Sequence, residues 1–201
     1  MYAQILIAVS FGLASYQDFR DRAVSDIVWI PGALGIAVAL YGAGPNLELS
    51  LIKLGLFGGI GLAFVFIGGI GQADAIAIVL VAGDPNLLSP IPPLIGAAGI
   101  SAILIGYQLA KGNVWGTKSI AIERFLKEKK WIPKALVIDG VRTDVESDVN
   151  IAREDVEARQ KPGAVVEVSY GVPTVEYIGI GYVLYMAYLL LLSPSTFVAL
   201  S

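Results

Sequence analysis

Long apolar segments are the feature that most restricts what this chain can fold into. A helix needs roughly 20 apolar residues to cross the hydrocarbon core of a bilayer. Five runs of this kind lie at residues 2–16, 27–43, 50–70, 91–110 and 174–193, and a shorter one lies at 75–82. Only 15% of the residues are charged, against about 25% in an average soluble domain. A soluble domain of 201 residues cannot bury this much apolar surface, so the sequence predicts an integral membrane protein.

The composition changes abruptly between residues 111 and 173. This stretch holds 11 of the 14 Lys and Arg residues and 10 of the 17 acidic residues, so we expect it to lie outside the membrane. The predicted fold class is an all-α polytopic membrane protein with about six transmembrane helices, the fourth of them short, and a small cytoplasmic α+β insert. The predicted domains are a membrane domain at 1–110, the insert at 111–173, and a last transmembrane helix at 174–201 that belongs to the membrane domain.

Within the insert, residues 119–130 have the pattern of an amphipathic helix. Its apolar side chains are Ile120, Ile122, Phe125 and Leu126. Two interpretations are open: the helix lies on the bilayer surface, or it packs on the insert itself. Two short strands are predicted in KALVIDGVR and AVVEVSY, and the polar stretch between them is expected to be a loop or a short helix.

The distribution of basic residues predicts the orientation in the membrane. If the short segment at 75–82 is a crossing, the loops at 17–26 and 71–74 lie on the same side as the insert. That side then carries 13 of the 14 basic residues, and only Lys53 lies elsewhere. Because basic loops are retained in the cytoplasm, we expect a multi-pass protein of the cell membrane with its N-terminus outside and residues 111–173 in the cytoplasm.

Histidine and cysteine are both absent from the sequence. Their absence excludes a Ser-His-Asp triad, a cysteine protease, a disulfide, and a zinc site built from His or Cys. Hydrolytic chemistry would therefore use carboxylates, hydroxyls or lysine, and no cofactor or metal is predicted. The net charge of −3 is too small to indicate a nucleic-acid partner.

Acidic residues near the membrane are the candidates for chemistry, because burying a carboxylate there is costly. Seven lie outside the insert: Asp18, Asp21, Asp26, Glu48, Asp74, Asp84 and Glu176. Asp18 ends the first apolar run and Asp74 begins the short one, so the predicted topology puts both at the cytoplasmic face. Two carboxyls at one level can act as general base and general acid on a water between them. Asp84 is expected at the opposite face, outside this site.

Each aspartate also has a purely structural interpretation. Asp18 would pair with a nearby arginine such as Arg22, four residues on, and mark the membrane edge. Asp74 would cap a short helix after a glycine-rich turn. Asp21 and Asp26 fit a loop or capping role better than a catalytic one. The sequence pattern alone leaves the catalytic and the structural interpretations open.

The surroundings of two aspartates resemble those of a known family. Asp18 lies in QDFRDRAVSDIVW, and Asp74 lies in GIGQAD about fifty residues later. The pattern is similar to the archaeal branch of the type IV prepilin peptidases, the preflagellin (prearchaellin) and prepilin peptidases, which are membrane aspartic proteases of the GxGD class. The resemblance covers most of the chain. It implies that Asp18 and Asp74 are the catalytic pair, and that the substrate is an archaellin or type IV pilin precursor whose short leader peptide is removed at the cytoplasmic membrane face.

The sequence departs from the GxGD pattern at its third position. Residues 71–74 read Gly-Gln-Ala-Asp, so Ala73 stands where the family has glycine. It is therefore open whether the backbone at residue 73 needs angles that only glycine adopts readily. The glycines at 68, 69 and 71 would also allow a close approach of another segment.

A function from another class is also open. A small membrane transporter or channel subunit would use the interfacial carboxylates to bind cations or relay protons. The sequence places no carboxylate in the middle of a predicted span, which counts against this alternative. The bilayer is a predicted partner under both functions, and the sequence makes no prediction about the oligomeric state.

Overall fold

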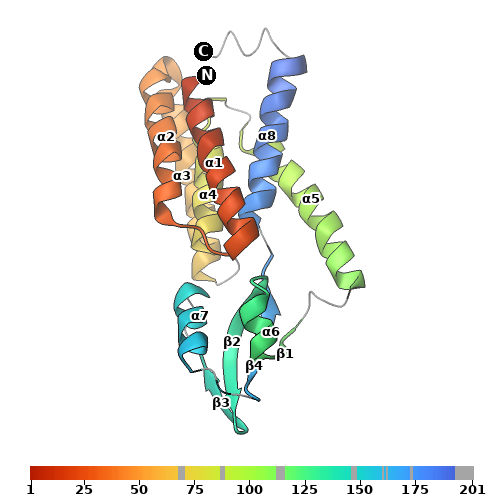
Figure 1. Ribbon diagram of the computed structural model, residues 1–201. Coiled ribbons are helices and arrows are strands. Elements are labelled where there is room, and N and C mark those ends of the chain that lie inside the picture. Colours follow the sequence, from red (N-terminus) through yellow and green to blue (C-terminus); the bar gives the residue numbers. More distant parts are fainter. Residues whose placement is uncertain are drawn as a thin grey trace. The chain divides into compact units, whose positions relative to one another are not determined.

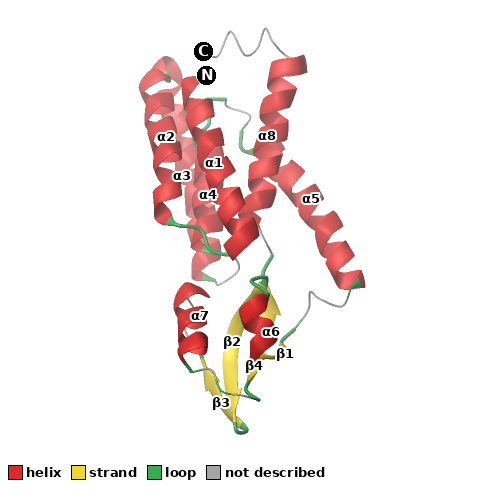
Figure 2. Ribbon diagram, viewed as in Figure 1, coloured by secondary structure: helices red, strands yellow, loops and turns green. Residues whose placement is uncertain are grey.

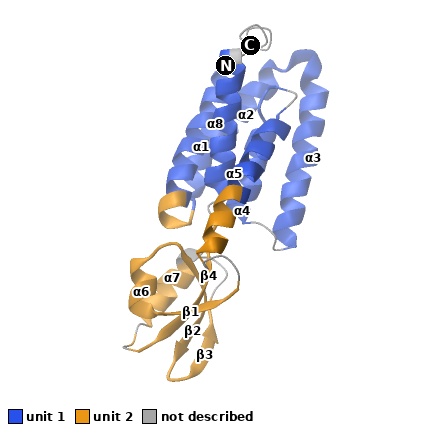
Figure 3. Ribbon diagram, turned by 90° about the vertical axis from the view of Figure 1, so that its right-hand side faces the viewer, with its two compact units in different colours: residues 1–18, 24–102, 173–201 blue, residues 19–23, 103–172 orange. Residues whose placement is uncertain are grey.

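The apolar runs of the sequence fold as helices, and the polar insert contains a small sheet (Figures 1 and 2). The computed structural model describes residues 1–67, 71–86, 89–111, 116–145, 149–159, 161, 163–172 and 174–192. Over these residues there are eight α-helices and one four-stranded antiparallel sheet. The chain divides into two compact units, coloured separately in Figure 3: residues 1–18, 24–102 and 173–201 form the first, and residues 19–23 and 103–172 form the second.

Six α-helices lie wholly or partly in the first unit. They are α1 (Tyr2–Asp21), α2 (Ile30–Gly42), α3 (Leu47–Phe66), α4 (Gln72–Ala82), α5 (Ile91–Ala110) and α8 (Thr174–Leu192), with single 3₁₀ turns η1 (Asp26–Trp29) and η2 (Gly44–Asn46) before α2 and α3. Within the described residues, three segments are long and apolar enough to cross a membrane: Gly44–Phe66, Ile91–Ala110 and Thr174–Leu191. These candidate spans support a membrane protein. The apolar helices at Asp26–Gly42 and Gln72–Ala82 are shorter, and α1 ends in a charged turn.

The first unit is held together by close contacts between α1, α4 and α8. Their almost fully buried apolar residues include Ile7, Phe11, Ala14, Ala77, Leu80, Val81 and Tyr182. The ring centroids of Phe11 in α1 and Tyr182 in α8 are 5.2 Å apart. Helix α4 packs on α3 as well as on α8, and a Cβ on Gly61 would stand 3.5 Å from the backbone of Ala75. A small residue at this crossing therefore lets α3 and α4 approach closely.

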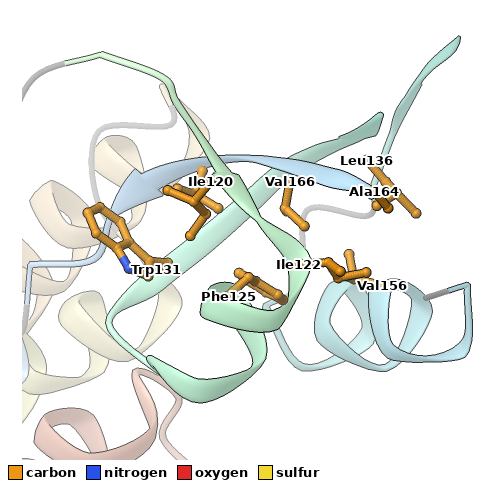
Figure 4. Close-up of a cluster of buried hydrophobic side chains, with 9 residues drawn as sticks. Ile120, Ile122, Phe125, Trp131, Leu136, Val156, Ala164 and Val166 are labelled. Carbon is orange, nitrogen blue, oxygen red and sulfur yellow. The ribbon is translucent and has the colours of Figure 1, made fainter. Parts of the chain in front are cut away.

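The second unit contains a sheet with the strand order β1-β4-β2-β3 and two short helices. Its elements are β1 (Lys118–Ala121), α6 (Ile122–Lys127), β2 (Trp131–Ile138), β3 (Val141–Asp144), α7 (Val149–Ala158) and β4 (Val165–Tyr170). Strands β2 and β3 form a hairpin through Asp139 and Gly140, which both have positive φ (52° and 79°), as a two-residue turn of this type requires. The core shown in Figure 4 consists of Ile120, Ile122, Phe125, Trp131, Leu136, Val156, Ala164, Val166 and Val168.

The prediction of one amphipathic helix over 119–130 is wrong. Residues Lys118–Ala121 form β1, which pairs with β4, and α6 covers only Ile122–Lys127. Ile120, Ile122 and Phe125 are at most 5% exposed and lie in the core of the insert, so these side chains do not lie on a bilayer. The open alternative, packing on the insert itself, is confirmed. The strand predicted in AVVEVSY is confirmed as β4. The single strand predicted in KALVIDGVR is wrong, because the hairpin turn at Asp139 and Gly140 divides this segment between β2 and β3. Helix α7 lies in the polar stretch before β4.

Candidate functional site

Asp18 belongs to the buried face of α1. Ile7, Phe11, Ala14 and Asp18 follow one another at spacings of four, three and four residues, which places them on one stripe of the helix. The stripe faces the core of the first unit, and Asp18 is only 7% exposed. A carboxylate thus occupies a position that the helical pattern otherwise reserves for apolar side chains.

The partner of Asp18 is the first turn of α8. The backbone N–H of Glu176 donates a hydrogen bond to Oδ2 of Asp18 at 3.2 Å. The first N–H groups of a helix have no partner within the helix, and a negative charge near them is favourable. Asp18 therefore satisfies a free N–H at the N-terminus of α8, and this contact ties the end of α1 to the start of α8.

Asp74 lies in the first turn of α4 and is partly buried. Its Oδ2 accepts a hydrogen bond from the backbone N–H of Gly71 at 3.0 Å. The structural interpretation of Asp74 is therefore confirmed in part, since its side chain does cap the helix, but from the third helical position and not from the N-cap. This capping contact uses one carboxylate oxygen and is compatible with a second role for the group.

Asp18 and Asp74 both belong to the first unit, and the electrostatic interaction between their two carboxylates is repulsive. Carboxyls that interact strongly titrate as a pair, with the protonation of one opposing that of the other. A pair of this kind can hold one ionised and one protonated carboxyl at the same time, which acid–base chemistry on a water requires.

The other acidic candidates near the site are engaged elsewhere or exposed. Asp21 forms ion pairs with Lys129 and, at 3.4 Å, with Arg20, and all three belong to the second unit. Asp26 is the exposed first residue of η1. Asp21 ends α1 and Asp26 begins η1, so neither lies in a loop, and the N-cap of α2 is Trp29 and not Asp26.

Ala73 does not need the conformational freedom of glycine. It lies in the first turn of α4, and Arg22 and Asp139 are the non-glycine positions with positive φ among the described residues. Alanine is the residue best suited to a helical backbone. The departure from GxGD at Ala73 therefore puts no strain on the backbone beside Asp74. The predicted close approach at residues 68 and 69 falls outside the described residues.

Asp84, which is expected from the sequence to lie outside the catalytic site, is the centre of a buried cluster of polar groups. It is 1% exposed, and its carboxylate accepts hydrogen bonds from Tyr182 Oη at 2.7 Å and from the Asn86 N–H at 2.8 Å. Lys53 Nζ donates to the backbone carbonyls of Asp84 and Asn86 at 2.6 and 2.8 Å. The feature of the sequence that could have indicated this cluster is Lys53, the one basic residue outside the predicted cytoplasmic side.

Among the described residues, no group of three or more His, Cys, Asp or Glu side chains could hold a metal ion. Comparisons with known proteins found no family model, no curated protein and no solved structure that matches this chain.

Proposed function

We propose that this protein is a membrane aspartic endopeptidase of the prepilin peptidase type, with Asp18 and Asp74 as its catalytic pair. The observation that carries the proposal is the placement of two carboxyls in the same unit, with Asp18 buried in the last turn of α1 and Asp74 in the first turn of α4. The resemblance of QDFRDRAVSDIVW and GIGQAD to the GxGD class names the same two residues.

The proposed chemistry needs only the two carboxyls and a water molecule. The ionised carboxyl removes a proton from the water as its oxygen attacks the scissile carbonyl carbon, and the protonated carboxyl donates its proton to the carbonyl oxygen. As the C–N bond of the resulting tetrahedral intermediate breaks, the carboxyl that took the water proton donates it to the departing amine. The other carboxyl takes a proton from a hydroxyl of the intermediate, so that the acid product forms and both carboxyls return to their starting states. No metal takes part in this sequence.

The proposed substrate is the precursor of an archaellin or of a type IV pilin. Its apolar helix would remain in the bilayer while its short leader reaches the carboxyl pair at the cytoplasmic face. In this topology six helices cross the membrane, with α4 as the short fourth, and the N-terminus lies outside. Support comes from the basic residues, of which 13 of 14 then face the cytoplasm.

The test of the proposed function is cleavage of a synthetic precursor peptide by the purified protein in detergent. Mass spectrometry of the products is expected to locate one cut, at the junction between the leader and the apolar segment. The Asp18→Asn variant, purified in the same way, is the control for a contaminating protease. Equal cleavage by this variant, or no cleavage by the parent protein of any archaellin or pilin precursor, contradicts the proposal.

A membrane transporter or channel subunit is the second candidate. The half-buried Lys53 and the buried Asp84 favour it, because ionisable groups inside membrane units often mark ion pathways. Proton or sodium flux into liposomes that contain the protein would support this candidate. Precursor cleavage without any flux would exclude it.

A further inference from the structure

Helix α4 is too short to cross a bilayer by itself. Its 11 residues give about 16 Å of helix, whereas the hydrocarbon core is about 30 Å thick. Beyond Ala82 the chain leaves the helix: residues 83–86 and 89–90 form turns, and α5 begins at Ile91. A non-helical backbone at membrane depth is tolerated only where the protein supplies partners for its polar groups.

Side chains from inside the turn and from α3 supply these partners. Ser89 Oγ donates to the carbonyl of Val81 in the last turn of α4 at 2.6 Å, and Lys53 of α3 donates to the carbonyls of Asp84 and Asn86. Asp84, Asn86 and Ser89 are each at most 5% exposed. The C-terminal end of α4 is therefore fixed by a buried polar cluster and not by water.

Helix α8 joins this cluster through one hydroxyl. Tyr182 is fully buried, and its Oη donates to Oδ2 of Asp84 at 2.7 Å. Its ring lies against Phe11 of α1, and Gln4 of α1 also hydrogen-bonds to Asp84. Side chains of α1, α3 and α8 therefore all converge on the turn that follows α4.

Two hydrogen bonds then connect α8 to α1, which carries Asp18, and to the turn directly after α4, which carries Asp74. The Glu176 N–H contacts Asp18, and Tyr182, six residues further along α8, contacts Asp84. Six residues correspond to about 9 Å along a helix, and the eight residues of α4 that follow Asp74 are similarly rigid. If α8 slides along its axis relative to Asp84, the Glu176 N–H moves with it. Asp18, which is bound to this N–H, then moves relative to Asp74 by a similar amount.

We propose that Tyr182 and Asp84 are positioning residues, whose hydrogen bond fixes the axial register of α8 against α4 and so sets the separation of the Asp18 and Asp74 carboxyls. This inference rests on the proposed function. Although Asp84 lies outside the predicted catalytic pair, its substitution is therefore expected to lower activity.

The test compares Tyr182→Phe with Tyr185→Phe. Tyr182→Phe removes the hydroxyl that contacts Asp84 and keeps the ring. Tyr185 lies on the same helix and is equally enclosed, but its hydroxyl has no hydrogen-bond partner among the described residues, so Tyr185→Phe is the matched control. We expect Tyr182→Phe to lower kcat about 10- to 100-fold with KM within about twofold of the parent value, because a small misplacement of reacting groups has effects of this size. Tyr185→Phe is expected to keep both parameters.

A second readout does not depend on activity. Because the chain has no cysteine, spin labels can be attached to two introduced cysteines, at the exposed positions Gln72 of α4 and Leu184 of α8. The measurement then gives the distance between these two labels. Tyr182→Phe is expected to shift or broaden the distribution of this distance, and Tyr185→Phe is expected to leave it unchanged. If Tyr182→Phe does not fold, Asp84→Asn carries the same test, with a smaller change expected because an acceptor oxygen remains.

The outcomes separate the inference from the proposed function. An unchanged kcat and an unchanged label distance in Tyr182→Phe overturn the inference, while cleavage that is still lost in Asp18→Asn leaves the proposed function intact. A lower kcat with an unchanged label distance also contradicts positioning by register. Full cleavage by Asp18→Asn refutes the proposed function. The label distance then still shows whether the Tyr182–Asp84 hydrogen bond fixes the axial register of α8 against α4.

Discussion

Ser10 should be one of the most sensitive polar positions of the first unit. Its side chain is fully buried in α1, where Oγ accepts a hydrogen bond from the Gly32 N–H at 2.6 Å and donates one to the Val28 carbonyl at 2.8 Å. One hydroxyl therefore satisfies two backbone groups at the start of α2. The substitution Ser10→Ala removes this oxygen and adds no atom that could clash.

The expected cost follows from the two backbone groups that lose their partner. A buried group left unpaired costs about 1–3 kcal/mol in a soluble protein, so two would cost about 2–6 kcal/mol. Within a membrane protein, side-chain hydrogen bonds contribute less, about 0.6 kcal/mol on average and up to about 1.7, because the unfolded helices also find partners. We therefore expect Ser10→Ala to lower the free energy of unfolding by about 1–3 kcal/mol.

Equilibrium unfolding in mixed micelles with an increasing fraction of SDS measures this change. Ser15→Ala is the matched control, since Ser15 lies on the same helix and its side chain makes no hydrogen bond with the described part of the chain. If Ser10→Ala unfolds at the same SDS fraction as Ser15→Ala, the argument from paired backbone groups is refuted.

Three further predictions concern the site and the insert. Ala73→Gly should retain cleavage and lower stability by about 1 kcal/mol, because Ala73 already has a helical backbone; loss of activity would show that the position does more. Cleavage should persist in EDTA, since the proposed chemistry uses no metal, and its loss with recovery on adding a divalent ion would point to a carboxylate–metal site. A hydrogen bond from Trp131, assisted by Lys130, lowers the pKa of Glu128 to about 2 from its ordinary value of 4.5. The stabilisation is complete above pH 4.5 and is lost as the pH falls toward 2, so the protection factors of the β2 amides against hydrogen exchange should fall over this range in the parent protein and much less in Glu128→Gln.

Several parts of the fold could be predicted because local pattern determines them. The apolar runs that contain α3, α5 and α8 are readable from length and hydropathy, and the alternation in β4 identifies a strand. Residues 119–130 could not be assigned in this way, because Ile120, Ile122 and Phe125 fit both a helical and an alternating pattern. Pairing of Lys118–Ala121 with β4, more than forty residues away, decided in favour of a strand.

The burial of one candidate residue could be predicted in the same way. Asp18 continues the buried stripe of Ile7, Phe11 and Ala14, so its burial follows from the helical period of the sequence. The cluster around Asp84 is different, because it depends on contacts across 31 positions to Lys53 and 98 positions to Tyr182. No local pattern contains this information, and only the packing of α3 and α8 on the turn after α4 creates it.

The most direct test of the catalytic pair is a comparison of Asp18→Asn, Asp74→Asn and the double variant in the precursor cleavage assay. Asn keeps the size and an acceptor oxygen of Asp but cannot exchange a proton near neutral pH. Because acid and base act as a unit, each single variant is expected to lose nearly as much activity as the double variant. Asp26→Asn, at the exposed start of η1, is the control and should cleave at the parent rate. Full cleavage by either Asp18→Asn or Asp74→Asn would contradict the aspartic-protease account.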